Sequence, residues 1–108
     1  MEKTEKALRV CGISQKYRFQ GPRYRELGDA SGQEFREEHL VPWLESLGGG
    51  SATIDFEGTR VFSPSFLEES FGGAIRADGR NRERLGGVSF VGIDRIWHDK
   101  LQRYIKEA

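Results

Sequence analysis

The segment that most constrains the fold is residues 52–58, in which apolar and polar side chains alternate strictly. Ala52, Ile54 and Phe56 would lie on one face of an extended chain, and the polar residues between them on the other. This period of two predicts a β-strand with one buried face. The segments before and after it show helical periodicity instead, so the strand should lie in a sheet on which helices pack.

The helix before this strand is predicted over residues 31–47. Ser31 and Glu34 form a capping-box pattern, in which the Ser31 hydroxyl accepts a hydrogen bond from the Glu34 N–H and the Glu34 carboxylate reaches back. The glycines at 48–50 should end the helix, because glycine favours the conformation that terminates helices. Pro42 removes one backbone donor inside the run, which predicts a kink or a break there.

A second helix is predicted over residues 64–76. Pro64 suits its first position, because the N–H at that position has no partner in any helix, and Ser63 or Ser65 can cap it. The pair Gly72-Gly73 is costly inside a helix, so we expect another backbone to approach closely at this point.

The remaining segments complete the predicted fold. Residues 8–14 are apolar, and aromatic and charged residues alternate over 17–19, so the two segments predict an N-terminal β-hairpin. Residues 88–93 have the pattern of a strand, and residues 94–107 have the pattern of an amphipathic helix. Residues 76–84 are polar and are expected to form a loop.

The predicted order is strand, strand, helix, strand, helix, strand, helix. This order indicates an α/β fold with a mixed sheet of about four strands, three helices packed on it, and right-handed crossovers where strands are parallel. A chain of 108 residues has the usual size of one domain, so we expect a single domain over residues 1–108.

Charge and hydropathy exclude several classes of function. Lysine and arginine number 17 and aspartate and glutamate also number 17, so no net charge favours nucleic acid or a membrane as partner. No apolar run approaches the roughly 20 residues that cross a bilayer. We therefore expect a cytoplasmic protein, in which the single cysteine, Cys11, is a small core residue.

Catalytic and metal-binding patterns are absent from the sequence. It contains no phosphate-binding loop, no dinucleotide-binding glycine motif and no nucleophile elbow. His39 and His98 lie on different predicted helices, without a second ligand at metal-binding spacing, and are expected to be exposed. The sequence thus predicts a protein that is not an enzyme, with no catalytic residue, no metal and no cofactor.

Three motifs occur together along the chain. They are Gly-Pro-Arg-Tyr-Arg at 21–25, Ser-Gly-Gln-Glu-Phe-Arg at 31–36, and a run over 54–73 that ends in Ser-Pro-Ser-Phe-Leu-Glu-Glu-Ser-Phe-Gly-Gly. With this combination, residues 21–108 resemble the family called the STAS-like domain of unknown function. That family is similar in layout to sulfate-transporter and anti-sigma-factor-antagonist domains. The resemblance implies a STAS-like fold and a non-catalytic regulatory module whose partner is a protein, a kinase- or ATPase-like regulator.

The resemblance also implies where the partner binds. In the antagonists, a serine at the start of a helix that follows a strand is phosphorylated by a partner kinase, and a helix N-terminus favours the added negative charge. The corresponding contact face or switch comprises Ser63, Pro64, Ser65, Phe66, Glu68, Glu69, Gly72 and Gly73. The alternative is that Ser63 and Ser65 only cap the helix, since Pro64 takes the place of the acceptor serine and Phe66 that of the glycine after it.

Two further functions use other residues. The first is binding of an anion or nucleic acid, for which the candidates are Arg76, Arg80, Arg82 and Arg84. Acidic neighbours and the lack of an aromatic residue among these arginines favour a solvated loop, so nucleic acid is the weaker candidate. The second is a small-ligand enzyme at the strand-to-helix junction, where open α/β sheets bind ligands. Its candidate residues are Asp55, Ser63 or Ser65, Glu68 and an arginine.

Overall fold

The computed structural model describes residues 6–48 and 51–108. Its sheet has three strands in the order β1, β2, β3, which comprise Lys6–Arg9, Ala52–Asp55 and Val88–Val91. Both strand pairs are parallel. Ala52 and Ile54 of the central strand are buried, which confirms that the alternating segment is a strand with one buried face.

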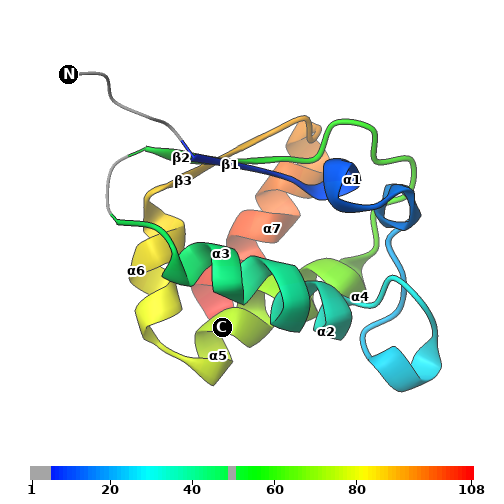
Figure 1. The fold of residues 1–108 in the computed structure, drawn as a ribbon, viewed down its shortest axis with the longest axis horizontal. Helices are drawn as coiled ribbons and strands as arrows, with labels where there is room; N and C mark the ends of the chain where they lie inside the picture. The colour runs from blue at the N-terminus through cyan, green and yellow to red at the C-terminus, as the bar shows by residue number, and fades with distance from the viewer. Residues whose placement is uncertain (1–5, 49–50) are drawn as a thin grey trace.

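Helices pack against one face of this sheet, so the α/β domain has two layers (Figure 1). The α-helical segments are α1 (Val10–Ile13), α2 (Gly32–Phe35), α3 (Val41–Glu45), α4 (Pro64–Leu67), α5 (Gly73–Ala77), α6 (Arg80–Gly86) and α7 (Arg95–Glu107). A π-helical turn joins α2 to α3 (η3, Arg36–Leu40), and a second joins α4 to α5 (η4, Glu68–Gly72). The described residues therefore form about five helices, more than the three predicted.

Side-chain caps fix where the two joined helices begin. Ser31 Oγ accepts a hydrogen bond from the Glu34 N–H at 3.0 Å, and Ser63 Oγ accepts one from the Phe66 N–H at 3.3 Å. The Ser31 cap is as predicted, and of the two serines that could cap the second helix it is Ser63 that does so. The reciprocal half of the capping box is wrong, because the Glu34 carboxylate instead accepts from the Tyr17 hydroxyl at 2.6 Å.

Pro42 does not break the first of these helices. The helix continues through η3 into α3, which contains Pro42, and ends at Glu45. A proline removes the donor for a carbonyl four residues earlier and crowds that carbonyl. The wider π turn directly before α3 is a distortion of this kind, so the predicted disturbance takes the form of a π turn and not of a break.

The predicted N-terminal hairpin is wrong, and with it the mixed four-stranded sheet. β1 ends at Arg9, the chain turns into α1, and Gln15–Arg18 then form a 3-10 helix, η1. Tyr17 is fully buried in η1, and its ring centroid lies 5.4 Å from that of Phe35. The aromatic alternation at 17–19 therefore comes from one buried anchor in a tight turn followed by an exposed Phe19.

The predicted polar loop over residues 76–84 is also wrong, because it contains much of α6. Asn81 is fully buried, and its side-chain amide donates to the Ala74 carbonyl at 2.9 Å. Leu85 is buried as well. One satisfied amide and one leucine thus anchor a helix whose sequence is otherwise polar, which is why it lacks an apolar period.

Aromatic side chains fill the space between the sheet and the helices. Phe35, Phe66 and Phe71 from the helices and Phe56 after β2 are fully buried. The ring centroids of Phe56 and Phe71 lie 6.2 Å apart, and those of Phe35 and Phe66 lie 5.4 Å apart. This cluster holds the helices against β2. In the part of the chain that the structure describes, no helix combines the length and apolarity needed to cross a membrane.

Candidate functional site

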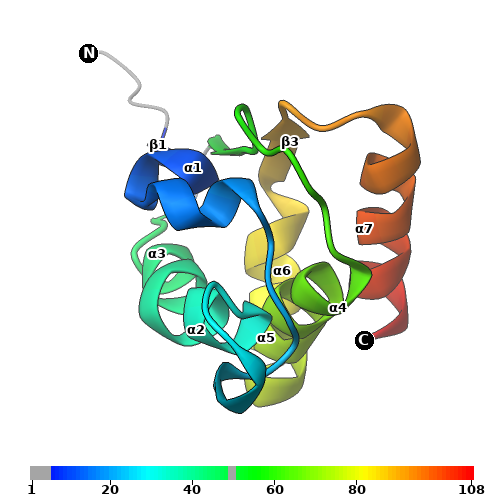
Figure 2. The same ribbon diagram turned by 90° about the vertical axis from the view of Figure 1, so that its right-hand side faces the viewer.

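The connection from β2 to α4 leads into the predicted contact face and passes between α1 and α7 (Figure 2). On the α1 side, Phe19 and Val61 form an isolated parallel bridge. On the α7 side, the Phe62 ring stacks on Trp97 with centroids 5.6 Å apart. These contacts between segments far apart in the sequence fix the loop that leads to Ser63.

The two candidate serines differ in what their hydroxyls contact. Ser63 is the N-cap, so its hydroxyl already accepts from the Phe66 N–H, and its own N–H donates to Gln20 Oε1 at 2.9 Å. Ser65 follows Pro64 in the first turn of α4 and is half-buried. Within residues 6–48 and 51–108, no group forms a hydrogen bond with the Ser65 hydroxyl. Ser65 is therefore the serine that can accept a new contact or modification without loss of the cap.

The later part of the predicted contact face lies inside the fold. Phe66 is fully buried, Glu69 is 7 % exposed, and Gly72 and Gly73 are buried. The helix turns its apolar stripe toward the core after its first turn, so only the start of the segment reaches the surface. The predicted residues that stay at least partly exposed are Ser63, Pro64, Ser65 and Glu68.

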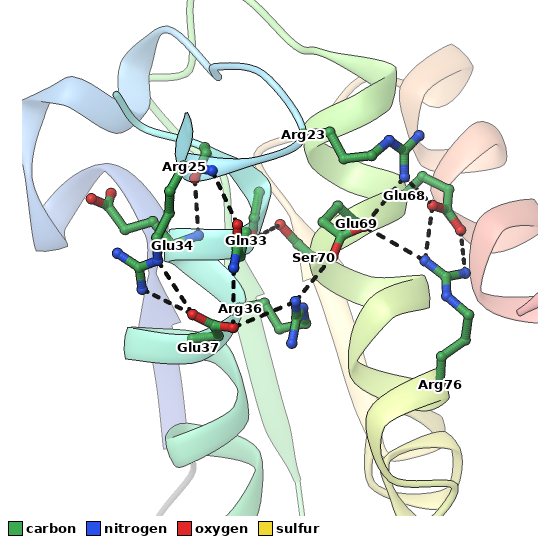
Figure 3. Close-up of polar contacts among 12 residues, drawn as sticks. Arg23, Arg25, Gln33, Glu34, Arg36, Glu37, Glu68, Glu69, Ser70 and Arg76 are labelled. Atoms are coloured by element: carbon green, nitrogen blue, oxygen red, sulfur yellow. Dashed lines mark hydrogen bonds and ion pairs between the residues drawn. The ribbon is translucent and has the colours of Figure 1, made fainter. Parts of the chain in front are cut away.

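An ion-pair network joins this helix to the loop before α2 and to η3 (Figure 3). Glu68 accepts from Arg23 Nη1 at 2.5 Å and from Arg76 Nη1 at 2.6 Å. Glu69 accepts from Arg36 Nη2 at 3.0 Å. The hydrogen bond from Arg76 lowers the pKa of Glu68, so this carboxylate stays charged at neutral pH. The adjacent carboxylates at 68 and 69 are therefore engaged in holding segments of the chain together.

The prediction that another backbone approaches closely at Gly72-Gly73 is wrong, because side chains approach there instead. A Cβ on Gly72 would lie 2.5 Å from Glu68 Oε2, and a Cβ on Gly73 would lie 2.9 Å from Arg36 Nε. The two glycines thus leave room for the ion-pair network.

The four arginines predicted as an anion site all have partners within the chain. These partners are Glu68 for Arg76, Asp78 for Arg80, the Ile105 carbonyl for Arg82, and Asn81 for Arg84. The hydrogen bond from Arg80 lowers the pKa of Asp78 to about 2. An anion would have to displace these contacts, so the geometry does not favour anion binding at residues 76–84.

The side chains predicted for an enzyme at the junction are engaged separately. Asp55 Oδ1 accepts from the Glu57 N–H at 2.8 Å, Ser63 caps α4, and Glu68 lies between two arginines. Each contact has a structural role of its own, and together they do not provide the base and nucleophile pair that such an enzyme needs.

Histidine and cysteine side chains do not form a metal centre. Among the described residues, no group of three or more His, Cys, Asp or Glu side chains could hold a metal ion. The prediction that His39 and His98 are exposed is wrong, since both are half-buried, with ring centroids 5.8 Å from Tyr17 and 6.3 Å from Phe90. Cys11 is half-buried at the surface and is not the core residue that its apolar neighbours predict.

Exposed apolar side chains adjoin the start of α4. Phe19 is 57 % exposed and Val61 is 49 % exposed, and Pro64 is exposed in the turn that follows. Together with Ser65 they form what we call the junction surface: Phe19, Val61, Pro64 and Ser65. The sequence did not predict Phe19 and Val61 as part of a site, because they lie far apart in the sequence and only a long-range bridge joins them.

Similarity to known proteins is found with a family model. The family model described as a STAS-like domain of unknown function matches residues 31–85. This range covers the motifs at 31–36 and 63–73 but not the motif at 21–25. No curated protein and no solved structure matches the chain.

Proposed function

Because the chain belongs to the family of STAS-like domains of unknown function, we propose that it is a non-catalytic regulatory module that binds a protein through the junction surface. The observation that carries the proposal is the exposure of apolar side chains beside a helix start with an uncommitted serine hydroxyl. The resemblance to anti-sigma-factor-antagonist domains supports a kinase- or ATPase-like partner in the cytoplasm.

The apolar part of the junction surface favours a protein partner. Phe19 and Val61 lie together, and covering them removes apolar area from water, which stabilises a complex. Backbone hydrogen bonds tie both segments, so this part of the surface is pre-formed and little ordering opposes binding. Arg60 is exposed next to Val61, which favours a partner that carries acidic residues at the rim of the contact.

Phosphorylation of Ser65 is the switch that fits this surface. A phosphate adds about −1.5 to −2 charges, and the first turn of a helix is where backbone N–H groups and the dipole favour negative charge. Ser65 lies in the first turn of a helix that continues through η4 to Ala77. The fold should therefore tolerate the phosphate, while the added charge beside Val61 and Pro64 opposes apolar contact. Ser63 suits this role less, because its hydroxyl already caps the helix.

Capture of a partner by the full chain tests the proposed surface. Phe19→Ser and Val61→Ser should each lose the protein that the parent retains. Leu27→Ser is the matched control, because Leu27 is 65 % exposed and lies in another part of the chain, in the 3-10 turn Arg25–Leu27. Thermal melts of all three variants verify folding. If Phe19→Ser retains the partner as well as Leu27→Ser does, the junction surface is not the binding site.

The switch is tested by Ser65→Asp beside Ser65→Ala. Both variants should melt like the parent, since no described residue depends on the hydroxyl, and only Ser65→Asp should weaken partner binding. A large loss of stability in Ser65→Asp would mean that the side chain is packed inside the fold, because a charge is desolvated only at high cost. Unchanged affinity of Ser65→Asp would remove the switch but leave the binding surface intact.

A further inference from the structure

Two adjoining hollows lie where β1 and β2 end, beside α1. The larger, of about 450 Å³, is lined by Arg18, Gly58, Thr59 and Arg60. The smaller, of about 330 Å³, is lined by Arg9, Cys11, Gly12, Arg18, Asp55, Glu57 and Gly58. Arg18 and Gly58 line both. The volumes are in the range of small-molecule sites, and the carboxyl ends of parallel strands are where open α/β sheets bind ligands.

Three arginines at these hollows, Arg9, Arg18 and Arg60, form no ion pair with another described residue. In the described part of the chain, no oxygen accepts a hydrogen bond from the side chain of Arg9, Arg18 or Arg60. The Nε of Arg18 is also buried without an acceptor. The arginines of the ion-pair network, in contrast, all meet carboxylates. Unpaired guanidinium groups at two adjoining hollows that share Arg18 favour an anionic ligand.

The backbone holds Arg18 and Arg60 next to each other. The Arg18 carbonyl accepts from the N–H of Arg60 at 2.7 Å and from that of Val61 at 3.1 Å. Gly58 has a φ of +95°, which strongly favours glycine, and the Thr59 N–H closes the turn on the carbonyl of residue 56 at 3.0 Å. The hollows are therefore pre-formed by tight turns and do not need to be ordered by a ligand.

The other groups at the hollows accept hydrogen bonds. Asp55 and Glu57 line the smaller hollow, and carboxylates at strand ends are suited to accept hydrogen bonds from ligand hydroxyls, as an acidic residue does for a ribose. None of the described lining residues is aromatic, so no ring is present on which a nucleobase could stack. The ligand chemistry that fits is therefore anionic at one end and rich in hydroxyl groups at the other.

We propose that the two hollows bind a small phosphate ester of the sugar or polyol phosphate class. The phosphate lies at Arg18 and Arg60, because guanidinium groups match phosphate oxygens in charge and geometry. The hydroxyl groups donate to Asp55 and Glu57. This ligand site goes beyond the regulatory function and depends neither on the junction surface nor on a modification of Ser65.

Calorimetric titration of the full chain tests the ligand class with three compounds: ribose 5-phosphate, inorganic phosphate and AMP. Ribose 5-phosphate should bind about tenfold more tightly than inorganic phosphate, because its hydroxyl groups add contacts. AMP should bind no more tightly than ribose 5-phosphate. Equal binding of inorganic phosphate would overturn the assignment in favour of a plain anion site. An AMP affinity about tenfold higher would overturn it in favour of a nucleotide site.

Variants test the assigned contacts. Arg60→Ala removes an exposed guanidinium and should lower the affinity for ribose 5-phosphate about tenfold or more, and Arg18→Gln should do the same. Arg103→Ala is the matched control, because Arg103 is exposed on α7 and lines neither hollow. Glu57→Ala should weaken binding of ribose 5-phosphate but not of inorganic phosphate. An equal effect of Arg60→Ala and Arg103→Ala would overturn the site, and this comparison holds even if Arg18→Gln fails to fold.

Discussion

Substitution of Gly32 by alanine tests how closely α2 and α4 must approach. A Cβ at this position would lie 2.7 Å from the Phe66 carbonyl oxygen and 3.0 Å from Glu69 Cβ. Ordinary contact begins near 3.4 Å, so the methyl group would have to be relieved by a shift of about 0.7 Å. The nearest atom belongs to the backbone and cannot rotate away as the end of a flexible side chain can. The two helices would have to separate.

The size of the effect follows from two opposing terms. Overpacking of this kind costs roughly 1–3 kcal/mol. In a helix interior, alanine is more favourable than glycine by roughly 1 kcal/mol of helix propensity. Gly32 is the first residue of α2, so the alanine variant gains at most part of this amount. A separation would also stretch the hydrogen bond from the Ser70 hydroxyl to the Gly32 carbonyl, which measures 3.3 Å. We expect a net loss of about 1–3 kcal/mol, and each kcal/mol lowers the Tm of a domain of this size by roughly 4–8 °C.

Urea melts followed by tryptophan fluorescence measure this loss, since Trp43 and Trp97 both pack against the core. Gly86→Ala is the control: Gly86 ends α6, and a Cβ there would meet nothing within 4 Å. The control should be neutral or stabilise by up to about 1 kcal/mol. If Gly32→Ala unfolds at the same urea concentration as Gly86→Ala, the inferred contact between α2 and α4 is wrong.

Three other changes probe the caps, the ion pairs and α6. Ser31→Ala removes the cap on the Glu34 N–H and should cost roughly 0.5–2 kcal/mol in urea melts, whereas a value near zero would contradict the capping role. The fold lowers the pKa of the Glu68 carboxyl below its ordinary value of 4.5. The ionised carboxylate therefore stabilises the fold fully above pH 4.5, and this stabilisation is lost as the pH falls through the lowered pKa. In acid, the Tm of Glu68→Gln should fall less than the Tm of the parent. Asn81→Ala removes the buried hydrogen bond to the Ala74 carbonyl, which keeps its bond from the Asp78 N–H, and should cost roughly 0.5–1.5 kcal/mol, while a neutral result would mean that α6 is not anchored there.

Sequence patterns predicted the parts of the fold that are determined by residues close together in the sequence. The caps at Ser31 and Ser63 each involve a residue three positions later, and the alternation over 52–57 depends only on the residues of that strand. The structure confirms the Ser31 cap and the strand, and it selects Ser63 from the two serines that could cap α4. At Gly72-Gly73 the pattern predicted the approach of another backbone, whereas the groups that approach are side chains from the ion-pair network.

Predictions of secondary structure from sequence patterns were wrong where contacts between distant segments determine the local structure. Tyr17 looks like a strand residue, but it is buried against Phe35 and donates to Glu34, contacts that no local period reveals. Asn81 looks like a loop residue, but it is buried, and its side-chain amide donates to the Ala74 carbonyl. In both cases one polar hydrogen bond inside the fold overrides the local preference.

In the candidate site too, some features follow from neighbouring residues and others from contacts between distant segments. The sequence places two serines at the start of a helix and cannot choose between them, since either could cap. Ser65 is the better candidate for modification because Ser63 is already engaged. The Ser63 hydroxyl accepts from the Phe66 N–H, and the Ser63 N–H donates to Gln20, a residue from a distant segment. Phe19 likewise joins the site only through its bridge to Val61.

Family membership and the proposed phosphate-ester site concern different parts of the chain. The family model matches residues 31–85, which contain both carboxylates of the ion-pair network, Glu68 and Glu69, and their partners Arg36 and Arg76 but not Arg23. Arg9 and Arg18 lie before that range, so two of the three arginines that line the hollows come from outside the matched segment. A ligand held by Arg18 therefore cannot be inferred from the family. It must be measured on this chain, and other members would share it only if they place a cation where Arg18 meets the turn at Gly58.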